Sequence, residues 1–176
     1  MAQTAIETET NLSVGDLVVY ASHGVGRVTT RETRAVAKQR EEVVVLEFPE
    51  GLSVTLPFER ALEYVRPVSS EAELASVRKT LRGGEGARDD VWQKRLKATR
   101  AKVTLGEAIG LAEVVRDGVR REHKSATRGG PAQLSLSERQ LYLKARKLLS
   151  EDIGASRGIE PSEADAWITD QLDEAK

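Results

Sequence analysis

The apolar positions of residues 12–67 follow the patterns of short β-strands. The runs "LVVY" and "GRVTT" flank a glycine-bearing turn, and the β-branched run "EEVVVLEF" follows them. Leu52, Val54 and Leu56 alternate with polar residues, which is the period of a strand with one buried face. A last run, "LEYVRPV", closes the series. Five short strands separated by short turns predict a small β-barrel with a thin core.

From residue 71 onward the period becomes helical. Leu74, Val77 and Leu81 recur at spacings of three and four, so residues 71–82 are predicted to form an amphipathic helix. The sequence "GGEG" then interrupts the pattern, because glycine disfavours the continuation of a helix. Apolar stripes at helical spacing resume after it, and they predict a compact domain of four or five helices.

Three of the predicted helix starts carry capping sequences, and one of them is Thr104 followed three residues later by Glu107. Ser135 stands three residues before Glu138, which is the spacing of a reciprocal capping box. Asp90 stands three residues before Gln93 in the same way. We therefore expect Asp90, or its neighbour Asp89, to cap the helix that contains the segment "WQKRLKATRAK".

These patterns predict an α+β protein in which a small N-terminal β-barrel precedes a compact all-helical domain. We expect a solvated leader over residues 1–11 and the barrel over residues 12–68. A helix and a glycine-rich linker follow over residues 69–86. The helical domain, with an acidic C-terminal end, is expected over residues 87–176.

The net charge of −1 conceals a strong segregation along the chain. Residues 1–86 carry a net charge of −3, residues 87–150 carry +8, and residues 151–176 carry −6. The basic block indicates a polyanionic partner, because phosphate contacts supply much of the affinity of proteins for nucleic acids. The alternative is a solvated, salt-bridged helical surface, and charge alone leaves both interpretations open.

Composition argues against several classes of protein. The chain has no cysteine, which excludes disulfides, thiolate metal sites and a cysteine nucleophile. It has no apolar run long enough to span a membrane, and its first eleven residues do not resemble a signal peptide, so we expect a cytoplasmic protein. His23 and His123 lie in different halves without the spacing of metal ligands. We therefore expect no metal, no cofactor and no enzymatic activity.

Trp92 stands at the front of the most basic segment of the chain, "ARDDVWQKRLKATRAK". On a helix, Trp92, Leu96, Thr99 and Val103 share one face, so burial of the indole in the core is one interpretation. The other is that a ring at the start of a helix projects beyond the packed stripe and contacts an unstacked base. The flanking cations that would contact phosphates are Lys94, Arg95, Lys97 and Arg100.

Several stretches, taken in order, resemble the CarD/CdnL family of bacterial transcription regulators. They are "VGDLVVYASHGVGRV", "VVVLEF", "VTLP", the pattern W-x-x-R-x-K, "GEAIGLAEVVRDGVRRE" and "LSLSERQLYLKARKLLSEDI". The resemblance covers residues 12–155. It implies that the barrel is Tudor-like (SH3-like) and docks on the β subunit of RNA polymerase, and that the helical domain contacts promoter DNA.

The resemblance also implies roles for individual residues. Trp92 matches a tryptophan that wedges into the minor groove at the upstream edge of the transcription bubble and stabilises the open complex. Arg95 and Lys97 match basic residues beside that tryptophan. Arg34 matches an arginine of the polymerase contact, and Thr55 stands where some relatives have a basic residue.

Two other functions remain compatible with the residues themselves. One is a protein-interaction adaptor that makes no DNA contact, and the other is an architectural DNA binder that needs no polymerase. The chain has no coiled-coil heptads, so we expect a monomer. On the resemblance, we expect it to be associated with the nucleoid through RNA polymerase.

Overall fold

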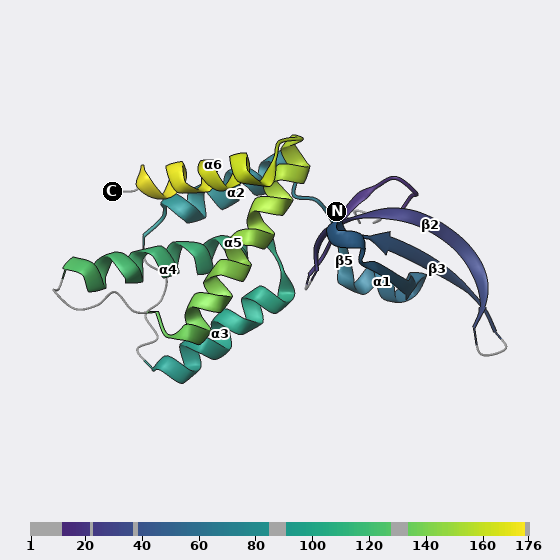
Figure 1. Cartoon of the computed structure of the whole chain (residues 1–176), viewed down its shortest axis with the longest axis horizontal. Coiled ribbons are helices and arrows are strands. Elements are labelled where there is room, and N and C mark those ends of the chain that lie inside the picture. Colours follow the sequence, from purple (N-terminus) through teal and green to yellow (C-terminus); the bar gives the residue numbers. More distant parts are fainter. Residues whose placement is uncertain (1–11, 22, 37–38, 85–90, 128–133, 175–176) are drawn as a thin grey trace, which may run out of the picture.

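The structure is a computed structural model that describes residues 12–21, 23–36, 39–84, 91–127 and 134–174. It contains an antiparallel five-stranded sheet followed by helices, which confirms the predicted α+β class (Figure 1). The predicted leader over residues 1–11 lies outside the described residues. None of the helices in this described part is both long enough and apolar enough to cross a membrane.

The strands of the sheet lie in the order β4-β3-β2-β1-β5. Every neighbouring pair is antiparallel. The two edge strands, β4 and β5, are not neighbours, and helix α1 contacts both of them. Closure of the sheet into a Tudor-like barrel therefore stays a prediction. The bounds are β1 (Leu17–Tyr20), β2 (Gly24–Val36), β3 (Gln39–Glu47), β4 (Ser53–Pro57), α1 (Phe58–Tyr64) and β5 (Val65–Pro67).

The core of this sheet domain lies between the sheet and α1. Val44 and Leu46 of β3 and Val28 of β2 are fully buried, and Ala61 packs against them from α1. The run "LEYVRPV" was predicted as a strand, but its first three residues end α1 instead. Ala61 occupies a fully buried position in the core, and it does so from one face of helix α1. Residues 62–64 therefore continue this helix instead of starting a strand.

Five helices make up the described part of the helical domain, and α5 lies at its centre (Figure 1). Helix α5 contacts α3, α4, α6 and strand β2. Helix α2, which begins and ends as predicted, buries its apolar face in the same core as α4 and α5. It is therefore part of the helical bundle in the structure. The bounds are α2 (Glu71–Arg82), α3 (Trp92–Leu105), α4 (Ala108–Thr127), α5 (Leu136–Arg157) and α6 (Pro161–Asp173).

The three predicted helix caps have different outcomes. The prediction for Thr104 is wrong, because Thr104 lies inside α3 and the next helix begins only at Ala108. The capping box of Ser135 and Glu138 is confirmed at the start of α5, where each side chain binds the other's backbone N–H. The prediction for α3 stays untested: Val91 occupies its N-cap position and makes no side-chain capping hydrogen bond. Asp89 and Asp90 lie outside the described residues. Among the described residues, the first turn of α3 is held by a contact of Arg95, which is described below.

The sheet domain and the helical domain meet where α3 ends. Gly106 ends α3 in the left-handed conformation, with φ of 67°. A Cβ at this position would lie 2.8 Å from the Cα of Ala21 in the sheet domain. Gly106 is therefore required for two reasons, its backbone conformation and the close approach of Ala21.

This close approach can be tested with a matched pair of glycines. Gly158 ends α5 with nearly the same φ, 66°, but a Cβ there would meet nothing within 4 Å. We expect Gly158→Ala to cost about 1 kcal/mol of unfolding free energy through backbone strain alone. Gly106→Ala should cost about 2–4 kcal/mol, because it adds the collision with Ala21. Urea denaturation measures both, and equal losses would show that Ala21 gives way freely.

Candidate nucleic-acid interface

Trp92 is the first residue of α3, and 45% of its surface is exposed. The face that it shares with Leu96, Thr99 and Val103 becomes more buried toward the end of the helix. Val103 is only 3% exposed, whereas Leu96 and Thr99 are half-buried. Trp92 lies at the outer end of this face and is not enclosed by the core. The structure thus leaves much of the indole accessible to a ligand.

A buried carboxylate holds the turn of α3 that carries Trp92. Glu138, at the start of α5, is 7% exposed and accepts hydrogen bonds from Arg95 at 3.0 Å and from Arg121 at 2.8 Å. Its second oxygen accepts hydrogen bonds from the backbone N–H and the hydroxyl of Ser135. These contacts join α3, α4 and α5 at one end of the bundle.

Hydrogen bonds stabilise the ionised form of Glu138. Burial by itself raises the pKa of Glu138, but the hydrogen bonds donated by Ser135 and Arg95 outweigh it and hold the pKa below its ordinary value. Burial and the nearby Arg95 lower the pKa of Arg121. Arg95 was predicted as a phosphate contact, and in the structure its guanidinium is engaged by Glu138. A contact between Arg95 and DNA would compete with that ion pair.

The other predicted cations of α3 lie on its solvent side. Lys94, Lys97 and Arg100 are all exposed. Lys94 and Lys97 are three residues apart and share the outward side of the helix, while Arg100 lies between that side and the face of Trp92. The structure therefore brings Trp92 and three exposed cations together on one helix.

Two apolar residues beside Trp92 were not singled out by the sequence analysis. Val91 is 51% exposed and Leu136, the first residue of α5, is 75% exposed. The starts of α3 and α5 lie close together, because Arg95 and Glu138 join them. We call Val91, Trp92 and Leu136 the tip of the helical domain. The exposure of Leu136 could have been predicted from the sequence, because Leu136 directly follows the capping Ser135 and lies outside the buried apolar stripe of α5.

The second tryptophan of the chain is part of the packing of the helical domain. Trp167 of α6 packs against the helical core and lies beneath the guanidinium of Arg157, whose Cζ is 4.5 Å from the ring centroid. The guanidinium of Arg78 from α2 is 5.7 Å from the same ring. Trp167 thus joins α2, α5 and α6.

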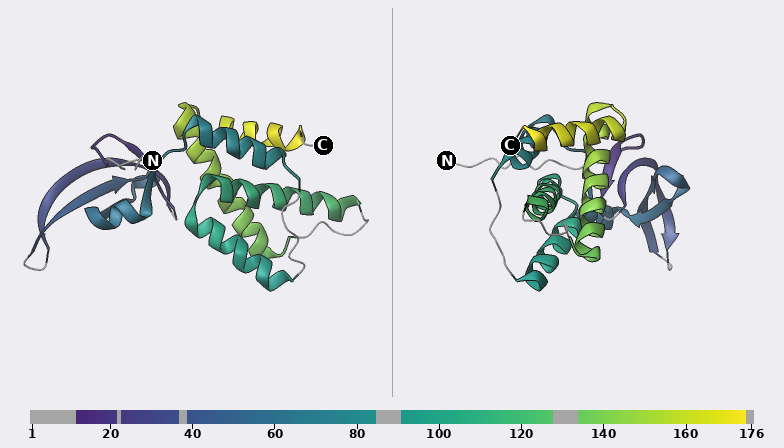
Figure 2. Two further views of the ribbon diagram at one scale, coloured as in Figure 1. Left: turned by 180° about the vertical axis from the view of Figure 1, so that it is seen from behind. Right: turned by 60° about the vertical axis from the view of Figure 1, so that its left-hand side comes forward.

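The predicted polymerase contacts lie in the sheet domain, far along the molecule from the tip (Figures 1 and 2). Arg34 is exposed on β2 and pairs with Glu32. Thr55 is exposed on the edge strand β4, opposite Val45 of β3. The strand register puts Arg34 and Thr55 on one face of the sheet but on the order of 15 Å apart. They are therefore separate points of one surface and not a single cluster.

The histidines do not form a metal site. His23 stacks on Tyr20, with the ring centroids 4.8 Å apart. Within the described ranges, no group of three or more His, Asp or Glu residues is placed to hold a metal ion.

The fold defines a two-domain α+β protein, and comparison with known families matches each domain separately. The family described as "CarD-like/TRCF RID domain" matches residues 12–69, and "CarD, C-terminal domain" matches residues 76–169. The chain belongs to the CarD-like family of transcription regulators. It is similar to the Bacillus subtilis (strain 168) protein named "Putative transcription factor YdeB", with 27% identity over 148 residues. The match covers 83% of this chain and 92% of that protein.

The exposure of Trp92 predicts a small effect on stability when the ring is removed. We expect Trp92→Ala to lower the unfolding free energy by about 1 kcal/mol or less, since much of the ring is already in solvent. Val103→Ala, at the buried end of the same face, should cost about 2 kcal/mol. Both are measured by urea denaturation. A loss of about 3 kcal/mol or more for Trp92→Ala, typical of a core aromatic, would contradict the exposed position.

Proposed function

We propose that this protein docks on the β subunit of RNA polymerase through its sheet domain and stabilises the open promoter complex with Trp92. The indole inserts into the minor groove at the upstream edge of the bubble. The observation that carries this proposal is the half-exposed indole on the first residue of a cationic helix. Family membership supports the polymerase contact, because the first domain is of the CarD-like/TRCF RID type.

The tip suits a wedge at the edge of melted DNA. An apolar side chain that enters the minor groove can separate stacked bases, and stacking on an aromatic ring contributes about 1–3 kcal/mol per base. Val91 and Leu136, at the starts of α3 and α5, are two further exposed apolar side chains of the tip. None of these contacts depends on base identity, so the tip would act at many promoters.

The exposed cations of α3 supply the part of the DNA affinity that does not depend on base sequence. Arg100 lies nearest to the face of Trp92, while Lys94 and Lys97 lie on the outward side of α3. All three are exposed and free of the core to contact backbone phosphates. Phosphate contacts position a protein without reading sequence. Arg95 acts mainly through Glu138, by holding the first turn of α3 in place.

The sheet domain provides selectivity by tethering. A DNA contact that tolerates any sequence becomes specific for promoters when a second domain binds the polymerase, because tethering raises the local concentration of the tip. Arg34 projects from the face of the sheet opposite to α1, and β4 is an edge strand that can accept a partner strand. Both features support this surface as the docking site.

The experiment that tests the wedge is the lifetime of open complexes after addition of a competitor. Wild-type protein should lengthen that lifetime, and Trp92→Ala should reduce the gain about tenfold, which corresponds to the loss of one stacking contact. Trp92→Phe should keep part of the gain because a smaller ring remains. An undiminished gain with Trp92→Ala would show that the indole is not the wedge, and a loss of polymerase binding would favour the adaptor function.

The tether is tested by reversing one charge. Arg34→Glu should weaken binding to core polymerase about tenfold or more, while the affinity of the protein for DNA alone stays unchanged. Arg60→Glu is the matched control, since Arg60 is exposed on α1, which covers the other face of the sheet. Polymerase affinity is measured by titration of a labelled protein. A promoter effect that persists undiminished in Arg34→Glu would refute tethering through this surface.

A further inference from the structure

We propose that helix α5 is a rigid spacer between the polymerase-docking sheet and the tip, and that the buried carboxylate of Asp152 clamps it to the sheet domain. The inference rests on the proposed function, since it concerns how the two contacts are held at a fixed separation. Asp152 is a positioning residue in this scheme and touches neither DNA nor polymerase.

Asp152 forms the polar centre of the junction between the domains. It lies on α5 and is fully buried. Its Oδ2 accepts hydrogen bonds from Arg66 of β5 at 2.7 Å and from the hydroxyl of Ser69 at 2.7 Å. Its Oδ1 accepts a hydrogen bond from the backbone N–H of Ser69 at 2.8 Å. A buried carboxylate requires such partners, so separation of the domains is strongly opposed.

Arg66 extends the clamp to a second helix. The same Nη2 that binds Asp152 also donates a hydrogen bond to the carbonyl oxygen of Gly106 at 2.8 Å, at the end of α3. The hydroxyl of Ser156, one turn after Asp152, donates a hydrogen bond to the carbonyl oxygen of Ser69. The sheet domain is thus fixed to the ends of both α3 and α5.

Both of these helices begin at the tip (Figure 1). Asp152 lies fourteen positions after Glu138 on α5, and Gly106, the C-cap of α3, lies fourteen positions after Trp92. At 1.5 Å per residue, each interval spans about 21 Å. Glu138 ties the two helices together at the tip, and Arg66 ties them together at the junction. The two helices therefore form a braced strut with charged contacts at both ends.

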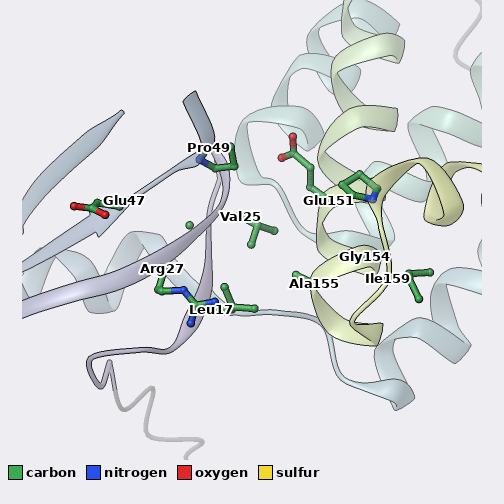
Figure 3. Close-up of a pocket in the computed structure, with 11 residues that line it drawn as sticks. Leu17, Val25, Arg27, Glu47, Pro49, Glu151, Gly154, Ala155 and Ile159 are labelled. Carbon is green, nitrogen blue, oxygen red and sulfur yellow. The ribbon is translucent and has the colours of Figure 1, made fainter. Parts of the chain in front are cut away.

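Beside this clamp, the interface between the domains contains open space. A cavity of about 330 Å³ lies between the sheet and α5, lined by residues that include Leu17, Val25 and Pro49 on one side and Glu151 and Ile159 on the other (Figure 3). Burial raises the pKa of Glu151, which accepts a hydrogen bond from the backbone of Val25. Apolar side chains from both domains line this cavity but do not fill it.

The covalent connection between the domains is also short. Only residues 68–70 lie between β5 and α2. These three residues belong to no helix or strand, so they can act as a hinge. If the clamp were absent, the helical domain could rotate about this hinge, and the tip at its far end would sample a larger volume. A tethered group that is spread in this way has a lower effective concentration at its target.

The clamp can be tested on the whole protein with distances in solution. The chain has no natural cysteine, so Thr33→Cys on β2 and Ala98→Cys on α3, both exposed, take two spin labels specifically. We expect one narrow distance distribution by electron–electron dipolar spectroscopy, and a broad one when Asp152→Asn is added. In unlabelled protein, Asp152→Asn should reduce the gain in open-complex lifetime about tenfold while the separate affinities for polymerase and for DNA stay within about twofold.

Asp165→Asn is the matched control. Asp165 is also an aspartate paired with an arginine, Arg146, but both lie in the helical domain. It should leave the distances and the lifetime unchanged. Ser69→Ala removes one hydrogen bond of the clamp and keeps the backbone donor, so it should broaden the distribution less. If the Asp152→Asn variant does not fold, the test is made with Ser69→Ala in its place.

Two results would overturn the proposal. A distribution that stays narrow in Asp152→Asn and Ser69→Ala would show that Asp152 is not the clamp. A broad distribution with an undiminished lifetime gain would show that the fixed separation is not needed. Failure of the proposed function would be recognised separately, as wild-type protein without any effect on lifetime, and the distances would still decide whether Asp152 clamps the domains.

Discussion

The structure depends on one carboxylate at the tip of the helical domain. Glu138 caps α5, binds Arg95 of α3 and binds Arg121 of α4, so three helices are fixed at the point where Trp92 emerges. Val91 at the N-cap of α3 makes no side-chain capping hydrogen bond, and Arg95 anchors the helix one turn after the indole. A ring at the start of a frayed helix would have no defined direction. The ion pair between Arg95 and Glu138 fixes the first turn of α3 and so gives the ring a defined direction.

The distribution of charge over the bundle supports this orientation. The exposed cations lie on α3, whereas α6, which carries half of the acidic residues of the C-terminal segment, lies on the other side of the bundle (Figure 1). A domain with opposite charges on opposite sides orients itself in the field of a polyanion before contact. The indole would then approach DNA ahead of the acidic side.

Much of the fold followed from local patterns in the sequence. The apolar spacing of Leu74, Val77 and Leu81 predicted α2 with its ends, and Ser135 with Glu138 predicted the start of α5. The predicted strand at Leu62 was wrong, because β-type composition says nothing of the core position that Ala61 fills from a helix. The contact between Arg95 and Glu138 could not be predicted either. It joins residues that are 43 positions apart and depends on how the helices pack.

The most direct measurement of the central claim is site-specific photocrosslinking from position 92. A photoreactive phenylalanine analogue in place of Trp92 would be irradiated in complexes with labelled promoter DNA, with and without RNA polymerase. The account predicts crosslinks to the DNA at the upstream edge of the bubble that depend on polymerase. Crosslinks to polymerase alone, or to DNA at scattered positions irrespective of polymerase, would contradict it.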